Sequence, residues 1–268
     1  MNTALRALAL CGALASLLWL SAGCVQVPQP GDAPEVKKSS DPAEIERRAR
    51  VRLELASAYF GRGQTATALE EAKQALAVKP DLVEAWNLRG LIYASQGETR
   101  LAEENFQRAL QINPRDGDTL HNYGWFLCQQ GRGVEADAQF QLALAQPQYV
   151  NAVRTLLAQG VCQARDGRLA EAERTLLRSY ELDAANPATA YNLADVLYRR
   201  GEYERARFYI RRVNSQPELS NAQTLWMAAR IENRLGNTNA TRQFGTQLSE
   251  RFPQSGEALK YERGRWDD

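Results

Sequence analysis

Small and apolar residues recur along the chain with a period of about 34 residues, from residue 49 to residue 255. Each unit contains two apolar stretches that are separated by a glycine. The second unit shows the pattern most clearly, with Trp86, Gly90, Tyr93, Gly97, Ala102, Phe106, Ala109 and Pro114. The glycine between the stretches supplies the backbone conformation that ends a first helix, and the late proline ends a second helix. The pattern predicts six helical hairpins, at residues 49–82, 83–116, 117–150, 153–186, 187–220 and 222–255.

The small residues of each unit predict how the two helices of a hairpin pack. The first helix is expected to cross the second at Gly90 in the second unit and at Gly124 in the third. A large side chain at either place would hold the two backbones apart. One hairpin cannot bury its own apolar stripe, so successive hairpins are expected to stack into one continuous core.

Both ends of the repeated region have the polar character that a stacked array requires. Residues 42–50 are charged and helix-forming, and they continue directly into the first hairpin. Residues 256–268 predict a polar capping helix and tail over the last hairpin. We therefore expect one helical body over residues 42–255, closed by this cap.

The first 23 residues have the pattern of a secretory signal peptide. Met1–Arg6 carries one positive charge, and Ala7–Ala22 is apolar or small throughout. This apolar stretch is short for a membrane span, and no charged stop sequence follows it. Residues 24–41 contain three prolines and little apolar periodicity, which predicts an extended tether.

Cys24 follows a Ser-Ala-Gly sequence and resembles the lipidated cysteine in the lipobox of bacterial lipoproteins. That family prefers leucine three residues before the cysteine, where this chain has Ser21, with Leu20 one place earlier. The resemblance implies cleavage before Cys24 and attachment of lipid to it. Val25 follows rather than aspartate, which by the family's sorting rule implies the outer membrane, reached through the lipoprotein sorting machinery. The alternative is an ordinary signal peptide with a chance cysteine.

Composition and charge exclude several functional classes. The chain is 44% hydrophobic and 24% charged, which is typical of a folded protein rather than a disordered one. A formal net charge of +1 gives no general attraction to nucleic acid. The chain has one histidine, and it lacks a phosphate-binding loop, a Cys-x-x-Cys pair and a His-Glu-x-x-His helix. We therefore expect no catalytic residue, no metal site, no cofactor, no small-molecule substrate and no nucleic-acid partner.

The repeated pattern resembles the tetratricopeptide repeat, in which small and aromatic residues occupy fixed offsets before a late proline. This resemblance implies an all-α fold, an α-solenoid of six helical hairpins that forms a right-handed superhelix. In this family the first helix of each hairpin lines a concave groove for protein ligands. Its groove positions correspond here to Asn87, Leu91, His121, Trp125, Tyr191, Asp195, Tyr198 and Trp226.

Aromatic side chains interleaved with amide and charged groups suit an extended or helical peptide. Two alternatives stay open for these positions. Trp125 and Trp226 are alternatively residues that pack between repeats. The single histidine, His121, is alternatively a hydrogen-bonding residue of the surface or core.

Two cysteines fall in the repeats. Cys11 leaves with the signal peptide and Cys24 carries the lipid, so Cys128 and Cys162 remain. These two are expected on the first helices of the third and fourth hairpins, and neighbouring cysteines in an oxidising periplasm tend to form a disulfide. The alternative is a pair of free buried thiols.

The third hairpin carries the sequence Asn-Tyr-Gly-Trp-Phe-Leu-Cys-Gln-Gln-Gly at residues 122–131. It resembles a motif of the type IV pilus biogenesis lipoproteins called PilF or PilW, and the resemblance extends over the whole chain. It implies a pilotin, which is a non-enzymatic lipoprotein that binds the pilus secretin subunit and brings it to the outer membrane. There it promotes multimerisation of the secretin or stabilises the pilus fibre. Two alternatives are a subunit of the outer-membrane β-barrel assembly machinery and an adaptor for peptidoglycan hydrolases.

Overall fold

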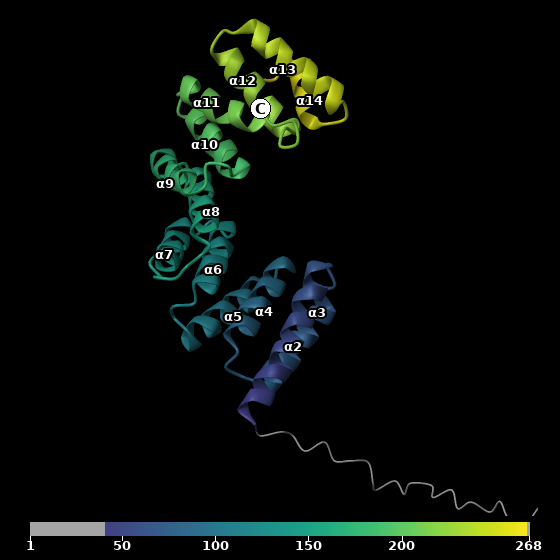
Figure 1. Cartoon of the computed structure of the whole chain (residues 1–268), viewed down its shortest axis with the longest axis vertical. Helices are drawn as coiled ribbons and strands as arrows, with labels where there is room; N and C mark the ends of the chain where they lie inside the picture. Colours follow the sequence, from purple (N-terminus) through teal and green to yellow (C-terminus); the bar gives the residue numbers. More distant parts are fainter. Residues whose placement is uncertain (1–40, 267–268) are drawn as a thin grey trace, which may run out of the picture. The chain divides into compact units, whose positions relative to one another are not determined.

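The computed structural model describes residues 41–266 of the chain. The predicted signal peptide, Cys24 and the predicted tether up to residue 40 lie outside the described residues. Within residues 41–266 there are thirteen helices and no strand (Figure 1). In chain order the helices are α2 (Pro42–Gly61), α3 (Thr65–Val78), α4 (Val83–Ser95), α5 (Thr99–Ile112), α6 (Gly117–Gln129), α7 (Gly133–Leu144), α8 (Ala152–Arg165), α9 (Leu169–Leu182), α10 (Pro187–Arg199), α11 (Tyr203–Asn214), α12 (Ala222–Arg234), α13 (Thr238–Arg251) and α14 (Gly256–Glu262).

The helices pair in sequence to form stacked hairpins. The pairs are α2 with α3, α4 with α5, α6 with α7, α8 with α9, α10 with α11, and α12 with α13. Both helices of a hairpin also pack against the first helix of the next hairpin. The predicted all-α solenoid of helical hairpins is therefore confirmed. The first helix begins at Pro42 and includes the charged segment that precedes the first repeat.

Two kinds of glycine shape each hairpin. The turn glycines have φ between 73° and 78°, a region that residues with a Cβ rarely adopt, and they are Gly63, Gly97, Gly131, Gly167, Gly201 and Gly236. Other glycines lie inside the first helix, where it crosses the second. A Cβ at Gly90 would lie 2.7 Å from Phe106, and one at Gly160 would lie 2.6 Å from Leu176. The predicted close crossing of the two helices is therefore observed.

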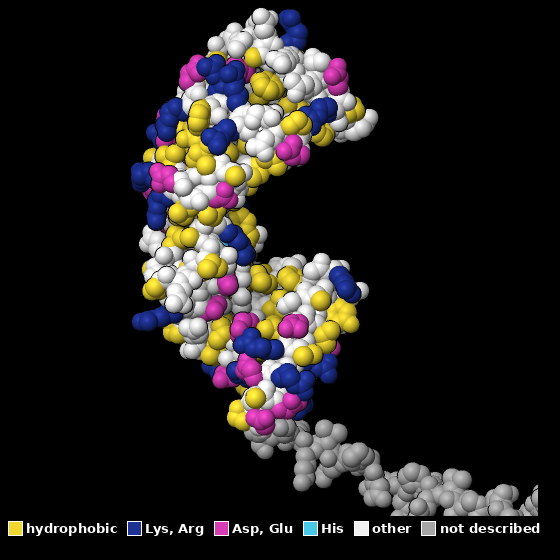
Figure 2. All heavy atoms as spheres, viewed as in Figure 1, with side chains coloured by type: hydrophobic (Ala, Val, Ile, Leu, Met, Phe, Trp, Pro, Cys, Tyr) yellow, Lys and Arg dark blue, Asp and Glu magenta, His cyan; other side chains and the backbone are white. Residues whose placement is uncertain are grey.

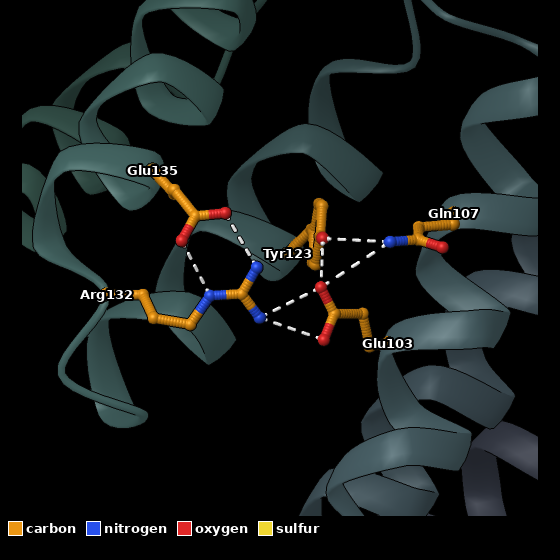
Figure 3. Close-up of polar contacts among 5 residues, drawn as sticks. All are labelled: Glu103, Gln107, Tyr123, Arg132 and Glu135. Carbon is orange, nitrogen blue, oxygen red and sulfur yellow. Dashed lines mark hydrogen bonds and ion pairs between the residues drawn. The ribbon is translucent and has the colours of Figure 1, made fainter.

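Ion pairs connect successive hairpins. Arg132, in the turn before α7, donates to Glu103 of α5 at 2.8 and 2.9 Å, and to Glu135 at 2.6 and 2.7 Å (Figure 3). The hydroxyl of Tyr123 on α6 donates to the same Glu103 at 2.8 Å. The next interface repeats the arrangement, since Arg168 before α9 pairs with Asp137 of α7. These pairs attach the second helix of one hairpin to the hairpin that follows.

The C-terminal segment covers the last hairpin. Tyr261 of α14 packs against Gly245 of α13, where a Cβ would overlap its ring. The ring of Trp266 stacks on Trp226 of α12, with centroids 5.3 Å apart. In the part of the chain that is described, no helix has the length and apolar character needed to cross a membrane.

Candidate protein-binding surface

Polar side chains form a row across the first helices of three successive hairpins. Asn122 of α6 donates from Nδ2 to the side-chain oxygen of Asn87 on α4, at 3.2 Å. The guanidinium of Arg154 on α8 donates to the side-chain oxygen of Asn122, at 3.3 Å. Asn151 adds a contact between the same hairpins, since it donates to Asp118 at 2.9 Å. Asn87 and Asn122 are half-buried and Arg154 is exposed, so the row lies at the surface.

An apolar row lies beside this polar row. Leu91, Trp125 and Ala158 follow Asn87, Asn122 and Arg154 by three or four residues along their helices, so they share the same helical faces. All three are half-buried and pack against a core cluster that includes Phe106 and Phe140. We call the two rows together the central surface, which consists of Asn87, Leu91, Asn122, Trp125, Arg154 and Ala158.

A disulfide lies next to the central surface. Cys128 and Cys162 follow Trp125 and Ala158 by one helical turn, and the structure joins them with Cα atoms 5.8 Å apart. That separation lies within the usual range for a disulfide. Both residues are buried, with exposures of 3% and 0%. The bridge links α6 directly to α8 and so holds the apolar row in register.

The groove positions of the fifth hairpin form a separate cluster on α10. Tyr191 and Asp195 are half-buried, and Tyr198 is buried. Burial raises the pKa of the Asp195 carboxyl, although the Arg199 guanidinium lies 3.7 Å away and acts in the opposite direction. The guanidinium of Arg230, on α12, lies 4.4 Å from the centre of the Tyr198 ring. Tyr198 is only 7% exposed, so the structure corrects its predicted place in a groove, and Tyr191 and Asp195 are the groups that this cluster offers at the surface. The cluster is not part of the central surface.

The structure corrects the prediction for His121. Its side chain is only 4% exposed and therefore does not line a surface groove. The Nδ1 atom lies 2.8 Å from the hydroxyl of Thr155, which in turn lies 2.7 Å from the hydroxyl of Tyr149. Burial, assisted by the positive charge of Arg154, lowers the pKa of His121 to about 4. His121 is thus a member of a buried hydrogen-bonded chain, and the alternative interpretation as a hydrogen-bonding core residue is the one that the structure supports.

Trp226 also lies in the interior rather than in a groove. It is 6% exposed because Trp266 covers it. The backbone oxygen of Trp266 accepts a hydrogen bond from Arg230 at 3.0 Å, which fixes this covering segment on α12. The alternative interpretation, in which Trp226 is a packing residue, is the one that the structure supports.

The prediction from repeat offsets missed Asn122 and Arg154. The residues in the polar row are separated by 35 and 32 positions, so a constant offset of about 34 places His121 where Asn122 lies. A signal was available, because Asn122 begins the motif at residues 122–131. Within residues 41–266, no group of three His, Cys, Asp or Glu side chains is arranged to hold a metal ion.

Comparison with known proteins agrees with the fold. The model of the family described as "Tetratricopeptide repeat" matches residues 83–116, and a second, described as "TPR repeat", matches residues 56–97. No curated protein matches the chain.

Solved structures give a closer likeness. PilW, described as a widely conserved type IV pilus biogenesis factor, is 31% identical with a TM-score of 0.74, over 79% of this chain and 97% of PilW. PilF of Pseudomonas aeruginosa is 25% identical with a TM-score of 0.72, over 82% of this chain and 99% of PilF. A tetratricopeptide repeat protein of Parabacteroides merdae is 17% identical with a TM-score of 0.58, over 84% of this chain and 85% of that protein, and it shows the fold alone.

Proposed function

Because this chain belongs to the PilW and PilF family of tetratricopeptide-repeat proteins of type IV pilus biogenesis, we propose that it acts as a pilotin. In this role it is an outer-membrane lipoprotein, anchored through Cys24 and facing the periplasm. It binds the pilus secretin subunit, brings it to the outer membrane and promotes its multimerisation there. The role is one of binding and placement, and it requires no chemical step.

The observation that carries the proposal is the central surface. Its polar row presents amide and guanidinium groups, which bind the backbone of a peptide or its polar side chains. The apolar row presents Leu91 and the ring of Trp125, which can bury an apolar side chain of the ligand. Tryptophan and arginine are enriched among the residues that dominate protein interfaces. A segment of the secretin subunit laid across α4, α6 and α8 would contact both rows.

The lipid anchor places the protein and its bound secretin subunit at the outer membrane. One acyl chain gives only marginal membrane binding, so stable attachment requires the multiple acylation that is typical of bacterial lipoproteins. Attachment commits the protein and its cargo to the lipoprotein sorting route. It also raises the effective concentration of secretin subunits at the membrane, which favours assembly of a ring.

Substitution of Trp125 tests the binding surface. We expect Trp125→Ala to weaken binding of the purified secretin subunit by about tenfold or more, because a large aromatic contact is lost. Leu142→Ala is the matched control, since Leu142 is an exposed apolar residue of α7 outside the central surface. Secretin binding at the wild-type level by a folded Trp125→Ala variant contradicts this assignment of the surface. A loss of several kcal/mol in unfolding free energy would instead identify Trp125 as a core residue.

Substitution of Cys24 tests the anchor independently of the surface. We expect Cys24→Ala to leave the repeats folded and able to bind secretin in solution, but to remove the protein from the outer-membrane fraction. Secretin multimers in that fraction should decrease in the same strain. Normal fractionation of the variant would refute the lipoprotein assignment without bearing on secretin binding.

A deletion strain separates the proposal from the other classes of function. Loss of surface pili and secretin multimers with normal growth supports a pilotin. A general defect in outer-membrane proteins indicates a role in β-barrel assembly, and a defect in cell separation indicates recruitment of peptidoglycan hydrolases.

A further inference from the structure

Phe208 occupies a position where the other hairpins have a residue that is not aromatic. It lies two residues after Ala206, the small residue at which α11 packs against its partner helix. The corresponding residues in the other hairpins are all exposed and polar or small, and they are Glu70, Glu104, Ala138, Arg174 and Gln243. Phe208 is itself 58% exposed. Packing of the repeat therefore does not require a phenylalanine there.

Phe208 belongs to a group of aromatic rings on α9 and α11. Its ring makes an edge-to-face contact with Tyr209, with centroids 5.1 Å apart, and Tyr209 makes the same kind of contact with Tyr180. The guanidinium of Arg212 lies 5.8 Å from the centre of the Tyr180 ring. Aromatic contacts of this kind hold their members in place. The exposed face of Phe208 is thus supported by fixed neighbours.

Arginines surround this group. The helix α11 contains four arginines and one glutamate. Two of the arginines pair with carboxylates, since Arg205 pairs with Glu173 and Glu202, and Arg207 pairs with Glu204 and Glu232. Arg211 is 53% exposed, although it also pairs with the buried Glu232 at 2.8 Å. Arg212 has no carboxylate within ion-pair distance among residues 41–266. In Figure 2 dark blue side chains adjoin yellow and magenta ones where Figure 1 places α11.

The same residues enclose a shallow depression on the exposed side of α11. Its volume is about 440 Å³, and its lining residues are Glu204, Arg207, Phe208, Arg211, Arg212 and Ser215. These residues recur at intervals of three or four and therefore occupy one face of the helix. We call this face the α11 surface. It is formed by a second helix of a hairpin, whereas the central surface is formed by first helices.

We propose that the α11 surface is a second protein-binding site, and that its ligand is an acidic segment of another protein that carries a leucine or aromatic side chain. Carboxylates of the ligand pair with Arg211 and Arg212, and the apolar side chain covers Phe208. An aromatic residue flanked by arginines has the composition of an energetically dominant interface patch. The proposal does not depend on what the central surface binds.

A defined peptide tests the chemistry of the site. The full-length protein is titrated with a labelled helical peptide in which glutamates flank leucine and phenylalanine, and with a control peptide that has lysine for every glutamate. We expect binding of the acidic peptide only, weakened about tenfold by Phe208→Ser and by Arg212→Glu, and weakened by added salt. Gln243→Ser, at the equivalent place in the sixth hairpin, should bind like the wild type.

Several outcomes would overturn the proposal. They are absence of binding to the acidic peptide, equal binding of both peptides, and unchanged binding by Phe208→Ser. Binding of phosphatidylglycerol vesicles in place of the peptide would make the α11 surface a lipid contact. Concentration-dependent dimerisation that Phe208→Ser abolishes would make it a contact between two copies of the chain.

Cross-linking in cells tests the natural partner. A photoreactive residue is placed at position 208, with position 243 as the control, and the attached peptide is identified by mass spectrometry. We expect a cross-link from position 208 alone, to a segment with net negative charge. Cross-links to a neutral or basic segment, to lipid, or equally from both positions would refute the acidic-ligand assignment.

Discussion

At the scale of single residues, Gly124 sets how closely α6 and α7 pack. A Cβ there would lie 2.9 Å from the ring of Phe140 and 3.2 Å from the backbone oxygen of Ala136. Glycine to alanine inside a helix normally stabilises by about 1 kcal/mol, but overpacking costs about 1–3 kcal/mol. We expect Gly124→Ala to lower the free energy of unfolding because the backbone oxygen cannot move aside. Urea unfolding measures the change.

Gly61 provides the matched control for this prediction. It is the last residue of α2, and a Cβ there would have no atom within 4 Å. Gly61→Ala should therefore leave the free energy of unfolding unchanged or slightly raised. An increase in stability for Gly124→Ala would show that the crossing can accommodate a methyl group.

His121 makes a distinct contribution to the pH dependence of stability. Its pKa falls from 6.5 to about 4 on folding, so the unfolded chain binds a proton first as the pH decreases. Titration of His121 does not change the free energy of unfolding above pH 6.5. Between pH 6.5 and about 4 it lowers this free energy, by about 3 kcal/mol in total. His121→Asn retains a polar group near Thr155 but does not titrate. We expect urea unfolding of this variant to show a smaller decrease over that range.

The comparison isolates His121 because both proteins contain the same carboxyl groups. Any decrease in stability from protonation of glutamates and aspartates therefore appears in both curves and cancels in their difference. Parallel curves from pH 7 to pH 4 would show that His121 is accessible to protons in the folded protein.

At the scale of elements, Glu103 connects the second hairpin to the third. Hydrogen bonds from Arg132 lower its pKa below 4.5, so its stabilisation is present above the unfolded pKa and is lost as the pH falls through the folded value. Arg132 is 35% exposed, and screening by solvent keeps the contribution small. We expect Glu103→Gln to cost about 1 kcal/mol at pH 7 and progressively less as the pH decreases below 4.5, measured by urea unfolding.

Glu135 is the control for Glu103, because it pairs with the same guanidinium but lies in the same hairpin as Arg132. Its side chain is 56% exposed, compared with 23% for Glu103. Glu135→Gln should therefore cost less than Glu103→Gln. Equal losses from the two substitutions would show that the pair does not connect the hairpins.

The hairpins could be predicted from the sequence because each depends on short-range rules. A turn with positive φ requires glycine, and a close helix crossing requires a small residue, so both leave a periodic trace. The stacking of adjacent first helices also explains why Cys128 and Cys162 could be paired from their spacing. The turns, the helix crossings and the cysteine pair each depend only on one hairpin and its neighbour.

The candidate site could be predicted only in part, because the stacked helices do not keep a constant offset. Asn87 meets Asn122 rather than His121, which a fixed repeat length cannot indicate. The repeat pattern predicts Trp226 in the groove for another reason. Trp266 covers it from a segment that carries no repeat pattern, so the pattern cannot indicate its burial. Phe208 does differ from the equivalent residues in the sequence. The sequence does not show that Phe208 and the equivalent residues of the other hairpins are exposed, and the structure does.

At the scale of the whole molecule, the separation of the two candidate surfaces suits a protein that holds one partner while contacting another. The central surface lies on α4, α6 and α8, and the α11 surface lies on α11. In a repeat array each hairpin depends mainly on its neighbours. Substitutions at Phe208 and Trp125 are therefore expected to act independently, and the two surfaces can be tested in one protein.

The end of the array depends on the C-terminal cap in the same nearest-neighbour manner. Leu225, Trp226 and Leu248 form a cluster that Tyr261 and Trp266 cover. Deletion of residues 256–268 uncovers this cluster, and complete burial of one large apolar side chain contributes about 1.5–3 kcal/mol. We expect amide hydrogens of α12 and α13 to exchange much faster after the deletion, while those of α4 to α8 keep their protection. Leu259→Ala is the control, because Leu259 is 44% exposed on α14 and should leave exchange unchanged. Equal acceleration along the whole array would show that it unfolds as a single unit, and no acceleration in α12 would show that the cap does not stabilise it.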